Sequence, residues 1–216
     1  ETGFYVNEAV KQGKKLGMGF GESIGWLIEE NPFGLNFTNS GISIFAAAYR
    51  YRVPATVHVL IGADIVHQHP NADYEAIGWA TGEDFLIFTQ TVFELDGGVF
   101  LNLGTAVHGP EVYLKALSMA KNVAAQKNQS ISNFTTAVFD IVDLGNWQEE
   151  KKLIYDWRVN WREPNEFSYE EIDPRYYFRP GKTVLTRTVN EGSGFYIKGD
   201  CGITIPNLYK RIVALL

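Results

Sequence analysis

The stretch GGVFLNLGTAV, from Gly97 to Val107, predicts a turn, a short apolar strand and an exit made of small residues. Val99 to Leu103 is a mostly apolar run with the length of a buried strand. It ends at Gly104-Thr105, where small side chains let a ligand approach the backbone closely. This order is typical of a strand that delivers a site at its carboxyl end.

The neighbouring segments extend this pattern. Pro110 is well placed as the first residue of a helix running to about Gln126, and Asn133 to Asp140 is a further strand-like run. Upstream, the β-branched run Ala55 to Ile61 predicts a buried strand. Helix and strand therefore alternate from about residue 40 to 143, which indicates an α/β fold with a Rossmann-like parallel sheet flanked by helices.

The rest of the chain is expected to be mainly helical, within one domain over residues 1–216. Helices are predicted over residues 1–15, Glu22 to Glu30, Asn39-Ser40 to Arg52, Glu83 to Leu95 and Ile205 to Leu216. Thr81 is expected to cap the fourth of these helices, and Pro206 stands at the entry of the last. A further helical stretch is expected from Asn71 or Ala72, and a short strand over Phe195 to Ile197. Residues of about 144–180 are rich in aromatic side chains and are interpreted as an insertion, either an irregular surface excursion or an oligomer contact.

Composition narrows the class of protein. The 216 residues carry a formal charge of −6, which disfavours binding to a nucleic-acid backbone. The single cysteine, Cys201, excludes an intrachain disulfide and favours a reducing, cytoplasmic setting. We expect no membrane association, because no run approaches the length of a spanning helix. The chain does not begin with Met, so we expect the native start to be missing.

The stretch Val53 to Asp73 concentrates titratable side chains. Its candidates for acid–base chemistry or, alternatively, for a metal site are Asp64, His67, His69 and Asp73. Imidazoles and carboxylates can act as acid and base near neutral pH, and together they can also bind zinc, iron or manganese. A polar substrate pocket and purely structural histidines remain open as well, and His58, inside the apolar run, is interpreted as a core histidine.

Two further groups of residues are candidates for a ligand site. The glycines Gly17, Gly19, Gly21 and Gly25 precede a helix but do not follow a strand, so they predict a turn between helices rather than a dinucleotide fingerprint. At the predicted strand ends, Thr136 and Asp140 add a hydroxyl and a carboxylate to Gly104-Thr105, and carboxylates there commonly bind ribose. His108 and Glu111 begin the next helix. A tight turn with a capped helix is the competing interpretation.

Taken in order, several segments resemble deoxyhypusine synthase and its bacterial relatives. They are SGISIFAAAYRYRVP (Ser40 to Pro54), Gly62-Ala63-Asp64, Gly98 to Val107, Thr136-Ala137 with Phe139-Asp140, and Gly199-Asp200-Cys201 ahead of Pro206. The resemblance implies a Rossmann-like sheet, the cofactor NAD, a polyamine-like substrate, and a homo-oligomer, dimer or tetramer, with shared sites. Carried over by position, it implies NAD contacts at Gly104, Thr105, Thr136, Ala137, Asp140 and Asp200, a substrate region near Asp64 and His67, and a catalytic role near His108 or Glu111.

The departures from that family limit the expected reaction. Some residues after Arg179-Pro180, the stretch TVLTRTVNEG (Thr183 to Gly192) has no lysine in place of the family's imine-forming lysine; Arg187 is its only basic residue, and arginine stays protonated. Aminobutyl transfer to a protein lysine is therefore not expected. The family's first part also has no counterpart, so we expect either a fragment or a partner chain that supplies it. The hypotheses are an NAD-dependent enzyme acting on a small amine or polar metabolite, a metal-dependent hydrolase, or a non-catalytic assembly subunit.

Overall fold

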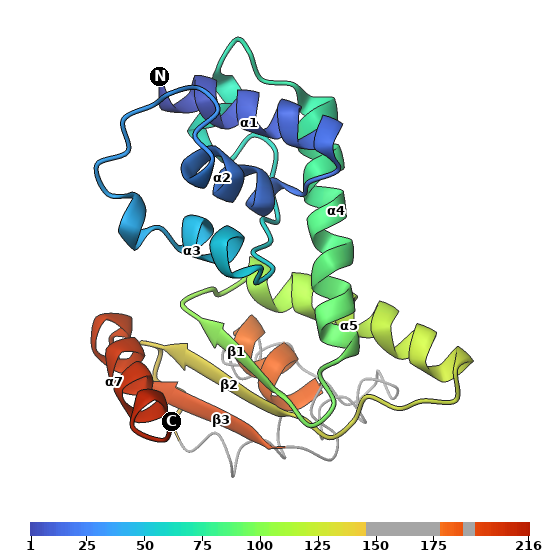
Figure 1. Cartoon of the computed structure of the whole chain (residues 1–216). Helices are drawn as coiled ribbons and strands as arrows, with labels where there is room; N and C mark the ends of the chain where they lie inside the picture. Colours follow the sequence, from blue (N-terminus) through green and yellow to red (C-terminus); the bar gives the residue numbers. More distant parts are fainter. Residues whose placement is uncertain (146–177, 188–192) are drawn as a thin grey trace, which may run out of the picture. The chain divides into compact units, whose positions relative to one another are not determined.

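The computed structural model describes residues 1–145, 178–187 and 193–216, and the chain divides into two compact units (Figure 1). Unit 1 comprises Glu1–Thr91 and unit 2 comprises Val92–Leu216. The aromatic-rich insertion predicted at about 144–180 lies outside the described residues, apart from its two ends.

Unit 1 is helical. Its elements are α1 (Thr2–Leu16), α2 (Phe20–Glu29), η1 (Ser40–Ile42), α3 (Ile44–Tyr51), η2 (Ile65–Gln68) and α4 (Tyr74–Phe93), whose last two residues belong to unit 2. The predicted end of the first helix is confirmed, because Gly17 adopts a left-handed φ of 77° and closes α1. Gly19 is the N-cap of α2, so the glycine cluster is a helix-joining turn as predicted.

Two predicted helix starts are wrong. The third helix begins at Ile44, because the Ser43 hydroxyl accepts the N–H of Ala46 and caps it; Ser40 belongs to the separate turn η1. Thr81 does not begin a helix but lies inside the continuous helix α4, which starts where the Asp73 carboxylate accepts the N–H of Ala76.

The predicted strand over Ala55 to Ile61 is also wrong, because these residues form no strand. Their backbone groups bond to side chains of α4 instead of to a neighbouring strand. The N–H of Val57 donates to Asp84 Oδ2 over 2.7 Å, and the N–H of Val59 donates to Thr81 Oγ1 over 2.9 Å. The Thr81 hydroxyl donates in turn to the carbonyl of Val57 over 2.8 Å. The apolar valines pack on the core of unit 1, which explains the strand-like pattern.

Asp84 ties three segments of unit 1 together. Its carboxylate is 1% exposed and accepts the N–H of Gly21, at the start of α2, as well as that of Val57. A Cβ on Gly19 would lie 1.9 Å from Asp84 Oδ1, and a Cβ on Gly21 would lie 1.7 Å from the carbonyl oxygen of Ala55. Only glycine at these two positions allows the segments to approach so closely. Burial raises the pKa of Asp84, although the backbone N–H donors act in the opposite direction.

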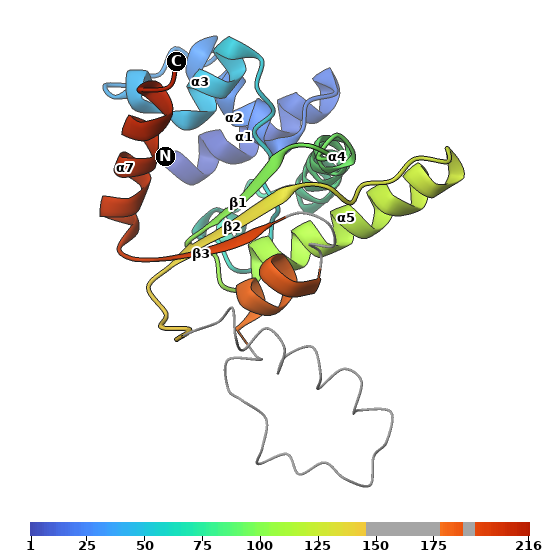
Figure 2. The same cartoon turned by 90° about the horizontal axis from the view of Figure 1, so that it is seen from below.

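Unit 2 is built on a three-stranded parallel sheet in the order β1-β2-β3. Its elements are β1 (Val99–Leu103), α5 (His108–Gln126), β2 (Thr135–Asp140), the π-helix η5 (Pro180–Arg187), β3 (Gly194–Lys198) and α7 (Cys201–Val213). In Figure 2, α5 and η5 lie on one side of the sheet and α7 on the other. The prediction of an α/β fold with a parallel sheet flanked by helices is confirmed at this level.

The two faces of β1 differ. Phe100 stacks on Tyr113 of α5, with ring centroids 3.9 Å apart, and Asn102 is buried on the same face. On the opposite face Val99, Leu101 and Leu103 are exposed. Within the described ranges, no helix combines the length and apolarity needed to cross a membrane.

Replacing Asp84 with Ala is expected to lower the stability of unit 1 by about 3 kcal/mol, because two buried N–H donors would lose their acceptor. Amide hydrogen exchange at Gly21 and Val57 measures this change. The control is Glu83→Ala on the same helix, which is expected to change exchange little. Equal effects of the two variants would contradict the role of Asp84.

The raised pKa of Asp84 also predicts a dependence on pH. Because the fold favours the protonated carboxyl, its contribution is complete below the ordinary pKa of an aspartate and is lost as pH rises through the raised value. Wild type should therefore gain stability relative to Asp84→Asn as pH falls from about 7 to about 4. Asp96→Asn is a control of opposite sign, since N–H donors from Asn133 and Ser132 lower the pKa of Asp96. A difference independent of pH would refute the prediction.

Candidate functional site

The carboxyl ends of the three strands of unit 2 form one edge. Gly104, just after β1, donates its N–H to the carbonyl of Phe139, and Gly199, just after β3, donates to that of Asp140. Gly104 has a φ of 63°, and within 4 Å a Cβ built on it would meet only the Sγ of Cys201. The structure thus brings together three predicted cofactor residues, Gly104, Asp140 and Asp200, around an open stretch of backbone.

The two carboxylates at this edge are fixed through one oxygen each. Asp140 Oδ1 accepts the N–H groups of Ile141 and Val142, and Asp200 Oδ1 accepts that of Gly202 and caps α7. This cap explains why α7 begins at Cys201, four residues before the predicted Ile205. The Oδ2 atoms of both aspartates accept no hydrogen bond from the described part of the chain, so each can still accept a ligand hydroxyl.

Thr136 and Ala137 do not reach this edge. They are the second and third residues of β2 and pair with Phe100 and Leu101 toward the other end of the sheet. Thr136 is fully buried, and its hydroxyl donates to the carbonyl of Val184 in η5. Both residues hold the sheet together, so the structure does not support their predicted contact with a cofactor.

The Thr105 side chain satisfies a backbone donor in the first turn of the following helix, whose N-cap residue is Val107. Its hydroxyl accepts the N–H of Gly109 over 2.9 Å, and its carbonyl accepts the side-chain amide of Asn102. Pro110 has no N–H, and that of Glu111 donates to the carbonyl of Val107. The first turn of α5 therefore offers few free donors for a phosphate, and the interpretation as a capped helix holds here. The helix begins at His108, two residues earlier than predicted.

The two catalytic candidates on α5 differ. His108 is exposed at the first residue of the helix, beside the carboxyl end of β1. Glu111 forms ion pairs with Lys115 and with Arg179, the latter at 3.4 Å. Glu111 is therefore engaged by two cations, whereas His108 is exposed beside the strand end and is the more accessible of the two to a ligand.

Sequence reasoning missed a polar group beside Asp140. Tyr196 donates its hydroxyl to the carbonyl of Val142, and Lys198 pairs with Asp143 over 2.5 Å. Burial, together with the nearby charges of Asp140 and Asp143, raises the pKa of Tyr196 to about 12. Lys198 lowers the pKa of Asp143. The alternation of side chains along the predicted last strand was the signal that could have placed Tyr196 and Lys198 on one face.

In unit 1, His67 is almost fully buried, at 5% exposure. Its Nδ1 accepts two backbone N–H groups, from Gly62 over 3.1 Å and from Asp64 over 3.2 Å. A nitrogen that accepts two donors carries no proton, so the ring proton lies on Nε2. His67 is therefore arranged as a hydrogen-bond donor, and the expectation that it serves as a base is not supported.

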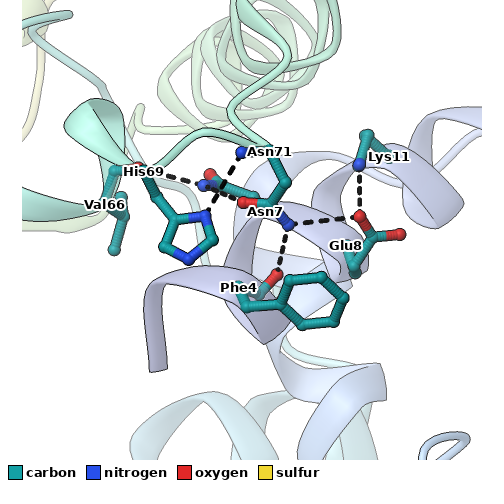
Figure 3. A network of polar contacts seen from close by, with 7 residues as sticks. All are labelled: Phe4, Asn7, Glu8, Lys11, Val66, His69 and Asn71. Carbon is teal, nitrogen blue, oxygen red and sulfur yellow. Dashed lines mark hydrogen bonds and ion pairs between the residues drawn. The ribbon is translucent and has the colours of Figure 1, made fainter. Parts of the chain in front are cut away.

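His69 belongs to a polar network that fastens η2 to α1 (Figure 3). Its Nδ1 accepts the N–H of Asn71, and its ring lies edge-on to that of Phe4. The Asn71 side chain donates to the carbonyl of Phe4 and to Glu8, and the buried Asn7 donates to the carbonyl of Val66 and to Asn71. His69 thus has a structural role.

The four alternative metal ligands do not come together. Asp64 caps η2 by accepting the N–H of Val66, and Asp73 caps α4. No three His, Cys, Asp or Glu side chains of the described ranges gather in a way that could hold a metal ion. His58 packs edge-on against Phe85 and Phe88, and burial lowers its pKa, in line with a core histidine.

Comparison with known proteins gives no relative: no protein-family model, no curated protein and no solved structure matches the chain.

The cap on α5 leads to a prediction. Thr105→Ala should destabilise unit 2 by about 1 kcal/mol, because the N–H of Gly109 loses its acceptor. Thr105→Ser, which keeps a hydroxyl, should retain most of that stability. Thermal unfolding of both variants tests this. Equal losses would show that the methyl group of Thr105, rather than its hydroxyl, matters.

Proposed function

We propose that the protein is an NAD-dependent enzyme of the deoxyhypusine synthase-like group, acting on a small amine or another small polar metabolite. The observation that carries the proposal is the meeting of Gly104, Asp140 and Asp200 at the carboxyl edge of a parallel sheet. This edge is where α/β sheets of this kind bind their ligands.

The residues present fit part of such a cofactor. The open backbone at Gly104 allows close approach, and the Oδ2 atoms of Asp140 and Asp200 suit the hydroxyls of a ribose. The first turn of α5 suits a phosphate less well, because Thr105 already accepts the N–H of Gly109. We therefore assign the ribose contacts to these carboxylates and assign no phosphate contact to α5.

The chain's own chemistry would then rest on His108. When bound, NAD supplies the capacity to accept a hydride. His108 lies exposed next to the edge and can take the proton that an amine loses on oxidation to an imine. Aminobutyl transfer is not part of the proposal, because the stretch Thr183 to Gly192, which resembles the family's imine-forming segment, contains no lysine. The proposal includes a homo-oligomer, which the resemblance to the family implies.

Calorimetric titration of the full chain with NAD tests the proposal. Asp140→Asn and Asp200→Asn should each weaken binding about tenfold, because a hydroxyl loses a charged acceptor while the Asn side chain preserves the local cap. The matched control is Asp96→Asn, since Asp96 accepts the N–H groups of Ser132 and Asn133 at the opposite end of the sheet.

If the titration gives no heat of binding at millimolar NAD, the proposal is wrong. If Asp96→Asn weakens NAD binding as much as Asp140→Asn and Asp200→Asn do, NAD binds elsewhere on the chain.

A further inference from the structure

We propose that a depression beside η2 in unit 1 binds an uncharged small molecule through a carbonyl or amide oxygen that accepts the Nε2–H of His67. The depression has a volume of about 550 Å³, within the range of small-molecule sites. It belongs to unit 1 alone, and the proposal does not depend on the binding of NAD.

The donor is fixed by the backbone around it. The N–H groups of Gly62 and Asp64 both point at Nδ1, which places the ring proton on Nε2. Gly62 reaches this position with a φ of 96°, a conformation that disfavours any side chain. The loop is thereby shaped to hold one tautomer of His67.

The donor also lacks a partner. No group in the described part of the chain accepts a hydrogen bond from Nε2, and this atom is not sealed from solvent. His67 itself lines the depression, and its relative exposure is only 5%. A buried side chain that lines a depression and has one unused donor is suited to an acceptor oxygen.

The walls decide the chemical class of the ligand. Ile61, Ile65 and the ring of Tyr74 give apolar surface, and the Tyr74 hydroxyl is already used, donating to the carbonyl of His67 over 2.7 Å. Asp64 also lines the depression, and no Lys or Arg does. The carboxylate of Asp64 disfavours an anion, and the donor of His67 disfavours a cation, so a neutral carbonyl or amide with an apolar body fits best.

Three probes of the same shape separate these classes. They are cyclohexanecarboxamide, cyclohexanecarboxylate and cyclohexylmethylamine, titrated into the ¹⁵N-labelled full chain. The carboxamide should bind most tightly, by about tenfold over the charged probes, and should shift Nε2 of His67 and the amides of Gly62 and Ile65. Equal binding of the three, or preference for a charged probe, would overturn the proposal.

Two matched variants complete the test. His67→Asn keeps an acceptor for the N–H groups of Gly62 and Asp64 but removes the outer donor, so carboxamide binding should fall about five- to tenfold. His69→Asn makes the same change outside the depression and should leave binding unchanged. Unaltered binding in His67→Asn overturns the proposal. If that variant does not fold, the ¹⁵N shifts of the wild-type ring decide, because a proton on Nδ1 would exclude the donor role.

Discussion

The buried carboxylate of Asp84 is the interaction on which unit 1 depends. It comes from the middle of α4 and accepts N–H groups from the start of α2 and from the extended segment at Val57. Burying an ionised group is costly, and the backbone donors that face Asp84 offset only part of that cost, so its pKa remains raised. The segment that leads to His67 is held at Val57 by this carboxylate, so Asp84 helps to position the loop around the histidine.

The strands of unit 2 were predictable because their sequence pattern and their environment agree. Val99 to Leu103 and Thr135 to Asp140 are short apolar runs bounded by turn residues, and both pair in parallel. The run Ala55 to Ile61 has the same local pattern, yet Thr81 and Asp84 provide its hydrogen-bond partners. Periodicity reports burial, and it cannot tell whether a backbone group will meet a strand or a side chain.

The features of the candidate sites also differ in how far the sequence could predict them. Asp140 and Asp200 follow strands directly, so their place at the sheet edge could be predicted from topology. Thr136 resembled a site residue but stands at the start of its strand, where its hydroxyl bonds to η5. The direction of the His67 ring depends on the φ of Gly62 and on two backbone donors. Such a detail arises only once the loop is folded, so the sequence could not predict which ring nitrogen is engaged.

The close contacts of Gly19 and Gly21 have a consequence for recognising relatives of this chain. Gly21 and Asp84 are 63 residues apart, yet a side chain at either glycine would strike the Asp84 carboxylate or the backbone that it holds. None of the three positions can change alone without disturbing the others. A sequence too distant to align along its whole length could still preserve Gly19, Gly21 and Asp84 at this spacing. These three residues are therefore a structural signature with which remote homologues of this fold can be sought.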